Sequence, residues 1–215
     1  MSSFYRTLQH ETQSDRAALL AVPIIQAALS GTLTRDQYVG FLTQAYHHVR
    51  HTVPLLMACG SRLDPASGPL QRAIAEYIEE EIGHDEWILN DIQACGVDPG
   101  AVRAGLPRHE TELMVAFAYH QIDRRNPIGF FGMVHVLEGT SVSVATRAAQ
   151  MIQQTLKLPT DAFSYLLSHG DLDQEHVLFF ENLMNQVVNH EDQLAIVHCA
   201  KRFYRLYADV FRSLH

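Results

Sequence analysis

Three side chains near residue 170 have the types and the spacing of metal ligands. They lie in the segment HGDLDQEHVLFF, residues 169–180. On a helix each residue turns about 100° from the last, so Asp173 lies about 40° from His169 and His176 about 20° to its other side. This sector also holds Phe180, whereas the opposite face carries its own polar residues. Exposure to solvent therefore does not explain why these three groups point inward.

A second stretch, AEYIEEEIGHDEWILNDI, holds a glutamate and a histidine three residues apart. On a continuous helix Glu81 lies within the apolar arc and His84 borders it, whereas Glu79 and Glu86 point to solvent. Residues three apart share a helix surface, so Glu81 and His84 can reach one metal ion. Asp85, in the same arc, either orients a ligand or bonds to the local backbone.

Glu138 is the only acidic residue of the apolar stretch NPIGFFGMVHVLEGTSVSVATRAAQMI, residues 126–152. It shares a helix face with Phe131, Val134 and Val142. An ionised carboxylate buried there would cost several kcal/mol even after relaxation. We therefore expect Glu138 to be paired, protonated or bound to a metal, and His135, three residues earlier, could act as its partner.

The inward set combines three carboxylates and three imidazoles from three helices: Glu81, His84, Glu138, His169, Asp173 and His176. Two divalent ions would overcompensate the charge of about −3, and this donor mixture suits iron or manganese better than a structural zinc. Di-iron sites in helical bundles use E-x-x-H pairs plus single carboxylates. One E-x-x-H pair, or one inward histidine, is a common accident. The coincidence of three such sets favours a site for two Fe(II) ions.

The elements that must hold this set all read as helices, because no segment alternates with the period of a strand. The expected helices span residues 4–29, 34–58, 67–94, 109–124, 127–156, 160–188, with a break near 169–170, and 190–214. Pro23 and Pro54 fall inside these patterns and are expected to kink them. His47, His48 and His51 could line the cavity of the site, but they are expected on a solvated face. The prediction is one all-α domain, residues 1–215.

Composition limits the partners and the compartment. The chain has 215 residues, is 47% hydrophobic and carries a net charge of −8, which disfavours nucleic acid and anionic membranes as partners. No uninterrupted apolar run reaches ~20 residues, so no membrane span is expected. Three dispersed cysteines and the lack of a secretion signal at the N-terminus favour reduced thiols in the cytoplasm.

Four segments together resemble the heme-oxygenase-like di-iron oxidases: LTRDQYVGFLTQAYHHV, EEIGHDEW, HVLEGTS and LPTDAFSYLLSHGDLDQEH. The resemblance extends from about Leu33 to Leu183. It implies the helical fold of about seven helices shared with heme oxygenase, the TenA thiaminases and the quinone-cofactor synthase PqqC, often as a homodimer. It also implies that the same six residues bind two irons, which activate O2 for oxidation of a small-molecule substrate.

Two departures from relatives keep other functions open. TenA thiaminases use a cysteine near the site, whereas Cys59, Cys95 and Cys199 lie far from every ligand motif. Heme oxygenase uses a histidine of its first helix, a part that His10 could imitate. We expect an iron-dependent oxidoreductase that uses O2. The alternatives are a metal-free enzyme of the TenA or PqqC type, or a non-catalytic protein that binds a metal or a small ligand such as heme.

Overall fold

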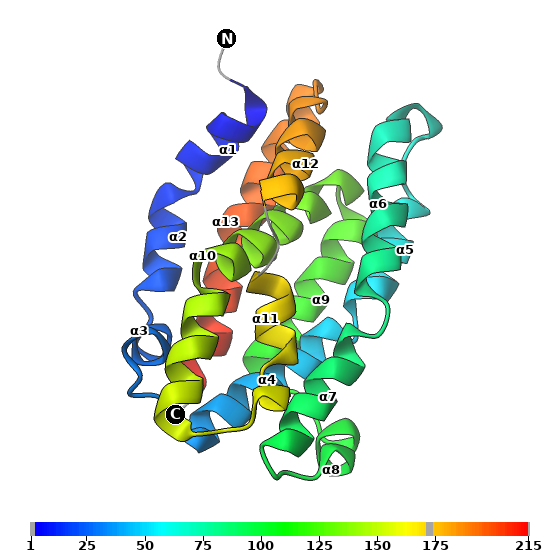
Figure 1. Ribbon diagram of the computed structural model, residues 1–215. Coiled ribbons are helices and arrows are strands. Elements are labelled where there is room, and N and C mark those ends of the chain that lie inside the picture. The colour runs from blue at the N-terminus through cyan, green and yellow to red at the C-terminus, as the bar shows by residue number, and fades with distance from the viewer. Residues whose placement is uncertain (1–2, 171–173, 215) are drawn as a thin grey trace.

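The computed structural model describes residues 3–170 and 174–214, and the side chains of residues 169–176 lie outside that description. Within the described residues the regular elements are all helical, which confirms the all-α prediction (Figure 1). The α-helices are α1 (Phe4–Glu11), α2 (Gln13–Leu20), α3 (Pro23–Ser30), α4 (Arg35–Val49), α5 (Thr52–Gly60), α6 (Gly68–Glu81), α7 (His84–Ala94), α8 (Pro99–Ala104), α9 (His109–Arg124), α10 (Phe131–Leu156), α11 (Ser164–Gly170), α12 (Gln174–Asn185) and α13 (His190–Arg212). Short 3-10 turns cover Pro65–Ser67, Pro127–Phe130 and Thr160–Ala162.

Several expected helices are divided, so the prediction of about seven long helices was too coarse. Residues 4–29 form three helices, and Pro23 begins the third instead of kinking a continuous one. Proline suits this first position because the N–H it lacks would have no helical partner there. Pro54 likewise lies in the first turn of α5. The region between the expected helices 67–94 and 109–124 contains a further helix, α8. Pro99 is its first residue, and the Asp98 side chain caps it by accepting a hydrogen bond from Gly100 N.

The long helix α10 crosses the middle of the molecule (Figure 1) and packs against α3, α11 and α13. Helix α4 packs on α7, and α5 packs on α6. Among the described residues one stretch, Pro127–Leu156, is long and apolar enough to cross a membrane. Core helices share this length and composition, and 61% of the most apolar part of the stretch is buried inside the fold.

A buried carboxylate fixes the start of α11 on α7. Asp91 is fully buried and accepts hydrogen bonds from the backbone N–H groups of Ser164, at 3.1 Å, and Tyr165, at 3.0 Å. The Ser164 hydroxyl donates a further bond to the same carboxylate. A buried carboxylate that accepts several N–H bonds satisfies groups that a helix start would otherwise leave unpaired. The anchor therefore sets where the residues of α11 stand relative to α7.

Candidate metal centre

Glu81 and His84 lie on two helices that meet at a turn. Glu81 ends α6, His84 begins α7, and between them Gly83 adopts a left-handed backbone with φ 92°. The sequence predicted one continuous helix here, and that prediction is wrong. Glycine adopts a left-handed conformation at little cost, so the chain can turn at Gly83, and the Ile82 side chain is exposed to solvent. The turn nevertheless brings the two side chains together, with His84 Nδ1 3.1 Å from Glu81 Oε2.

Glu138 faces this pair from α10. Protein surrounds its carboxyl group on most sides, but the side chain also borders internal cavities. Because part of its surface faces these cavities, the residue is half-buried by accessible surface area. Burial, together with the negative charges of Glu81 and Glu80, raises the pKa of Glu138 to about 8. The buried Tyr77 hydroxyl is close enough to lower this pKa slightly, yet within the described residues it makes no hydrogen bond of ordinary geometry. A cation beside Glu138 would relieve this unfavourable environment.

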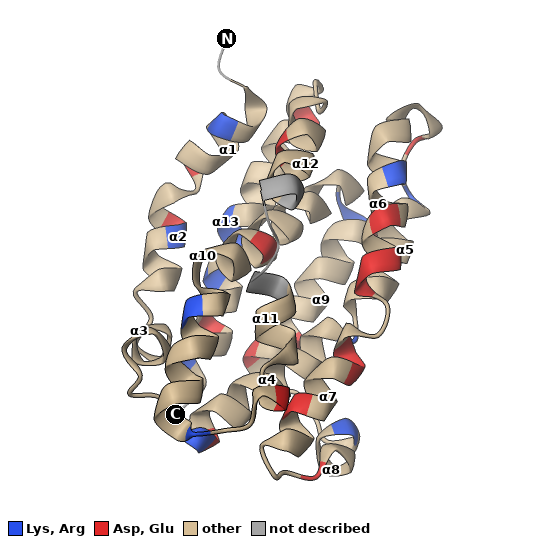
Figure 2. Ribbon diagram, in the orientation of Figure 1, with Lys and Arg blue, Asp and Glu red and all other residues tan. Residues whose placement is uncertain are grey.

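The three residues share a cavity of about 290 Å³. Its ionisable lining residues come from four helices: His48, Glu80, Glu81, His84 and Glu138. Acidic residues recur along α6 and α7, which carry two sides of this lining (Figure 2). No lysine or arginine occurs among the described residues that line the cavity. Its charge is therefore one-sided and suited to a cation.

Asp173 lies outside the described residues, and the side chains of the other two predicted ligands, His169 and His176, lie outside the description as well. Within the described part of the chain, no group of three His, Cys, Asp or Glu side chains is close enough to hold an ion. The helices that carry His169 and His176 are nearby. Helix α11 packs against α7 and α10, and α12 packs against α6.

Two histidines expected at a solvated face are buried instead. His47 is 3% exposed and His48 2%, because α4 is covered by α7 and α9. His48 lines the 290 Å³ cavity and meets the Tyr207 ring edge-on at 6.0 Å between centroids. Burial lowers the pKa of His47, which keeps its ring neutral near pH 7. The error arose because a helix covered on several sides has no single face that its sequence pattern can mark as buried.

Three further histidines lie in other surroundings. His51 is half-buried, and its Nδ1 lies 3.3 Å from the Tyr119 hydroxyl. His135, expected as a partner of Glu138, instead places Nε2 3.4 Å from the Thr12 hydroxyl, and burial lowers its pKa to about 4. His10 is exposed on α1, so it lacks the enclosed setting of a heme ligand. Asp85 is half-buried in the first turn of α7.

Aromatic residues at the cavity were not found from the sequence. Tyr77, Trp87, Tyr165 and Tyr207 all line it. Trp87 is the single tryptophan of the chain, and its ring centroid lies 4.3 Å from that of His84. Its position three residues after His84 on a helix was the available signal. The tyrosines gave none, because they come from distant parts of the chain.

All three cysteines are buried and free. Burial raises the pKa of Cys59 and of Cys199 to about 12, and that of Cys95 to about 11. Such thiols stay protonated at neutral pH and are poor nucleophiles. None of them lines the 290 Å³ cavity. The cavity therefore offers no thiolate for chemistry of the thiaminase type.

Comparison with protein families identifies the chain. The model of a family described as iron-containing redox enzymes matches residues 39–208. The chain belongs to this family. The matched range includes both helices of the Glu81–His84 pair, the whole of α10 and the segment that carries the three remaining predicted ligands. A search of curated proteins gives no match.

Solved structures show which fold this member of the family has. A domain of unknown function with a heme oxygenase-like fold from Shewanella denitrificans aligns over 100% of this chain and 92% of its own, with a TM-score of 0.87 and 21% identity. A TenA homologue from Pseudomonas syringae gives a TM-score of 0.83 at 12% identity over 98% and 91% of the two chains. Heme oxygenase from Leptospira interrogans gives 0.77 at 16% identity over 99% and 100%. The fold is therefore heme oxygenase-like.

The donor types of the described residues suit iron, although no three of these side chains by themselves lie close enough to hold an ion. Two carboxylates and an imidazole converge on one cavity, and carboxylate–imidazole mixtures without thiolate are typical of non-heme iron. Glu138 in particular needs either a proton or a cation, because its surroundings hold other carboxylates and no described basic side chain lines the 290 Å³ cavity. The chain also belongs to a family described as iron-containing redox enzymes.

Proposed function

We propose that this chain is an O2-dependent non-heme di-iron oxidase or oxygenase that acts on a small-molecule substrate. The observation that carries the proposal is the enclosed carboxyl of Glu138, with its raised pKa, facing the Glu81–His84 pair across one cavity. Six ligands are proposed in all, the others being His169, Asp173 and His176. Two ferrous ions, when bound, would supply the reducing equivalents and the open binding positions that O2 activation needs.

The protein's own residues position this chemistry. Glu81 and His84 would hold an ion from the junction of α6 and α7, and Glu138 would approach from α10 and release its proton on binding. Ionised Glu138 could then accept a hydrogen bond from the buried Tyr77 hydroxyl, which makes none of ordinary geometry within the described residues. Leu137 and Val49 contribute apolar wall. Such walls exclude water and strengthen the electrostatic interactions inside.

A metal-free enzyme of the TenA type is the second candidate, since TenA homologues share the fold. Against it, each described cysteine is buried with a raised pKa, and none lies at the cavity. A non-catalytic protein that binds a metal or a small ligand is the third. These candidates differ in whether the protein holds metal and whether the metal-bound protein consumes O2.

The test loads the full chain with Fe(II) without oxygen, removes unbound iron, and then measures O2 consumption with a reductant present. We expect bound iron and O2 uptake in the wild type, and loss of both in Glu138→Ala. Glu79→Gln is the matched control, because Glu79 is exposed on α6. Absence of bound iron would favour the metal-free enzyme, and bound iron without O2 uptake would favour the binding protein.

A further inference from the structure

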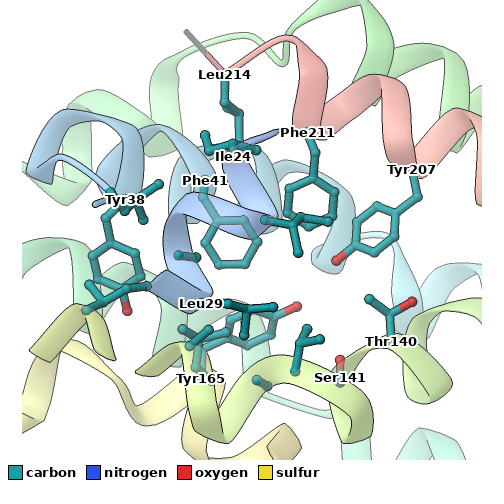
Figure 3. A pocket seen from close by; sticks show the side chains of 18 residues that line it. Ile24, Leu29, Tyr38, Phe41, Thr140, Ser141, Tyr165, Tyr207, Phe211 and Leu214 are labelled. Carbon is teal, nitrogen blue, oxygen red and sulfur yellow. The ribbon is translucent and has the colours of Figure 1, made fainter. Parts of the chain in front are cut away.

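A second cavity lies beside the 290 Å³ cavity that Glu81, His84 and Glu138 line, which we call the metal cavity because of the proposed iron site. It has a volume of about 70 Å³ and is enclosed by α3, α4, α10, α11 and α13. Its far end is aliphatic and aromatic, with Ile24, Leu29, Phe41, Phe211 and Leu214 around it (Figure 3). We call it the apolar side cavity.

The near end of the apolar side cavity carries hydroxyl groups. Ser141, Tyr165 and Tyr207 line both this cavity and the 290 Å³ metal cavity, so the two spaces share a wall. In Figure 3 the hydroxyls of Ser141 and Tyr207 lie to the right of Phe41 and Leu29, and that of Tyr165 points toward the same side from beside Leu29. The space is therefore polarised, with hydroxyls next to the metal cavity and hydrocarbon beyond them.

Small side chains keep the apolar side cavity open. Ala28 projects into it from α3, and Ala145 and Ala148 project into it from α10. Protein interiors are otherwise packed about as densely as organic crystals, and an unfilled apolar space forfeits dispersion contacts. Empty apolar cavities stay dry and bind apolar ligands, as a cavity of about 150 Å³ binds benzene. By that ratio, 70 Å³ holds an apolar group of roughly three carbons.

We propose that the apolar side cavity binds a short apolar arm of the substrate, while the reacting end of the same molecule lies in the metal cavity. The substrate class is thus a small amphiphile whose polar and apolar parts meet at the three shared hydroxyls. This inference rests on the proposed function only in assigning the reacting end to the metal cavity. The arm itself is recognised by shape and hydrocarbon, independently of any metal.

The test measures dissociation constants for straight-chain primary alcohols from methanol to 1-hexanol by ligand-observed NMR. The full chain is used both metal-free and loaded with Fe(II). Each methylene that enters the cavity should tighten binding by about fourfold, the factor that corresponds to about 0.8 kcal/mol per buried CH2. The gain should stop after about three methylenes have entered, because the cavity is then full. Phe211→Ala, which removes part of the far wall, should move that limit to longer chains.

Ala28→Leu should fill the apolar side cavity and abolish the gain with chain length. Ala27→Leu is the matched control, since Ala27 is the preceding residue of α3, is half-buried as Ala28 is, and does not line the cavity. Equal effects of the two variants, or a wild-type affinity that does not change with chain length, would overturn the inference. If Ala28→Leu does not fold, an unchanged length limit in Phe211→Ala overturns it. Failure to bind iron or consume O2 would refute the proposed function and leave these binding results standing.

Discussion

Glu138 should make the metal-free protein less stable as the pH rises. An ordinary glutamate has a pKa of 4.5, whereas burial and neighbouring charge raise that of Glu138 to about 8 in the fold. Between these values the unfolded chain releases the proton and the folded chain keeps it, so ionisation favours unfolding. The penalty is absent below the lower pKa, grows through the window and is complete above the upper one.

The size of this effect follows from the two pKa values. One pKa unit corresponds to about 1.36 kcal/mol, so Glu138 should lower the free energy of unfolding by about 3–4 kcal/mol between pH 5 and pH 9. Glu138→Gln keeps nearly the same shape but is neutral throughout. Without metal, this variant should match the wild type within about 1 kcal/mol at pH 5 and exceed it by about 4 kcal/mol at pH 9.

Urea unfolding of chelator-treated protein, followed by circular dichroism across this pH range, measures the effect. Glu79→Gln serves as the control, because its exposed side chain should leave the pH dependence unchanged. Excess Fe(II) should reverse the order at neutral pH, since the wild-type carboxylate then binds the ion and glutamine cannot. Parallel pH profiles for the wild type and Glu138→Gln would show that Glu138 is not an enclosed carboxyl and would refute the reasoning.

Three further changes have expected outcomes. Glu81→Gln should abolish O2 uptake. Glu86→Gln, which removes an exposed ion pair with Arg103, should leave O2 uptake unchanged and lower the free energy of unfolding by at most about 1 kcal/mol. Equal losses of O2 uptake in the two variants would show that the ligand assignment is wrong. Replacing all three cysteines by alanine should leave O2 uptake intact, and the native thiols should resist iodoacetamide at pH 7; rapid alkylation that destroys uptake would restore the thiaminase-type alternative. Asp91→Ala should lower the free energy of unfolding by about 2–4 kcal/mol, because it leaves buried N–H donors at the start of α11 unpaired; a loss below about 0.5 kcal/mol would contradict the anchor.

Local sequence signals predicted most of the fold. The strongly periodic segment 109–124 forms α9 with the same bounds, and the apolar stretch that contains Glu138 forms the central α10. The helix ends were harder to predict, because a glycine within an amphipathic pattern costs a helix little free energy and gives no clear signal that the helix ends there. The break at Gly83 was therefore not predicted, although the Glu81 and His84 side chains do lie next to each other, with His84 Nδ1 3.1 Å from Glu81 Oε2.

The rest of the site depended on tertiary packing. His48 was expected at a solvated face, yet it is buried at the cavity because two other helices cover α4. Tyr165 and Tyr207 come from α11 and α13, and no periodicity within either helix indicates that both reach the same space. Cavities form where several elements fail to fill a volume together, so the apolar side cavity could not be predicted from any single segment.

The central claim is that Glu138 and the Glu81–His84 pair belong to one iron site. Its most direct test is the Fe(II) content of the full chain, loaded without oxygen and freed of unbound metal, together with the quenching of Trp87 fluorescence, since Trp87 lies against His84. The wild type should bind about two Fe(II) per chain with strong quenching, as expected of a paired-carboxylate helical site. Glu138→Gln should lose bound iron, and Glu79→Gln should match the wild type. Undiminished iron content in Glu138→Gln, or bound iron that leaves Trp87 fluorescence unchanged, would contradict the claim.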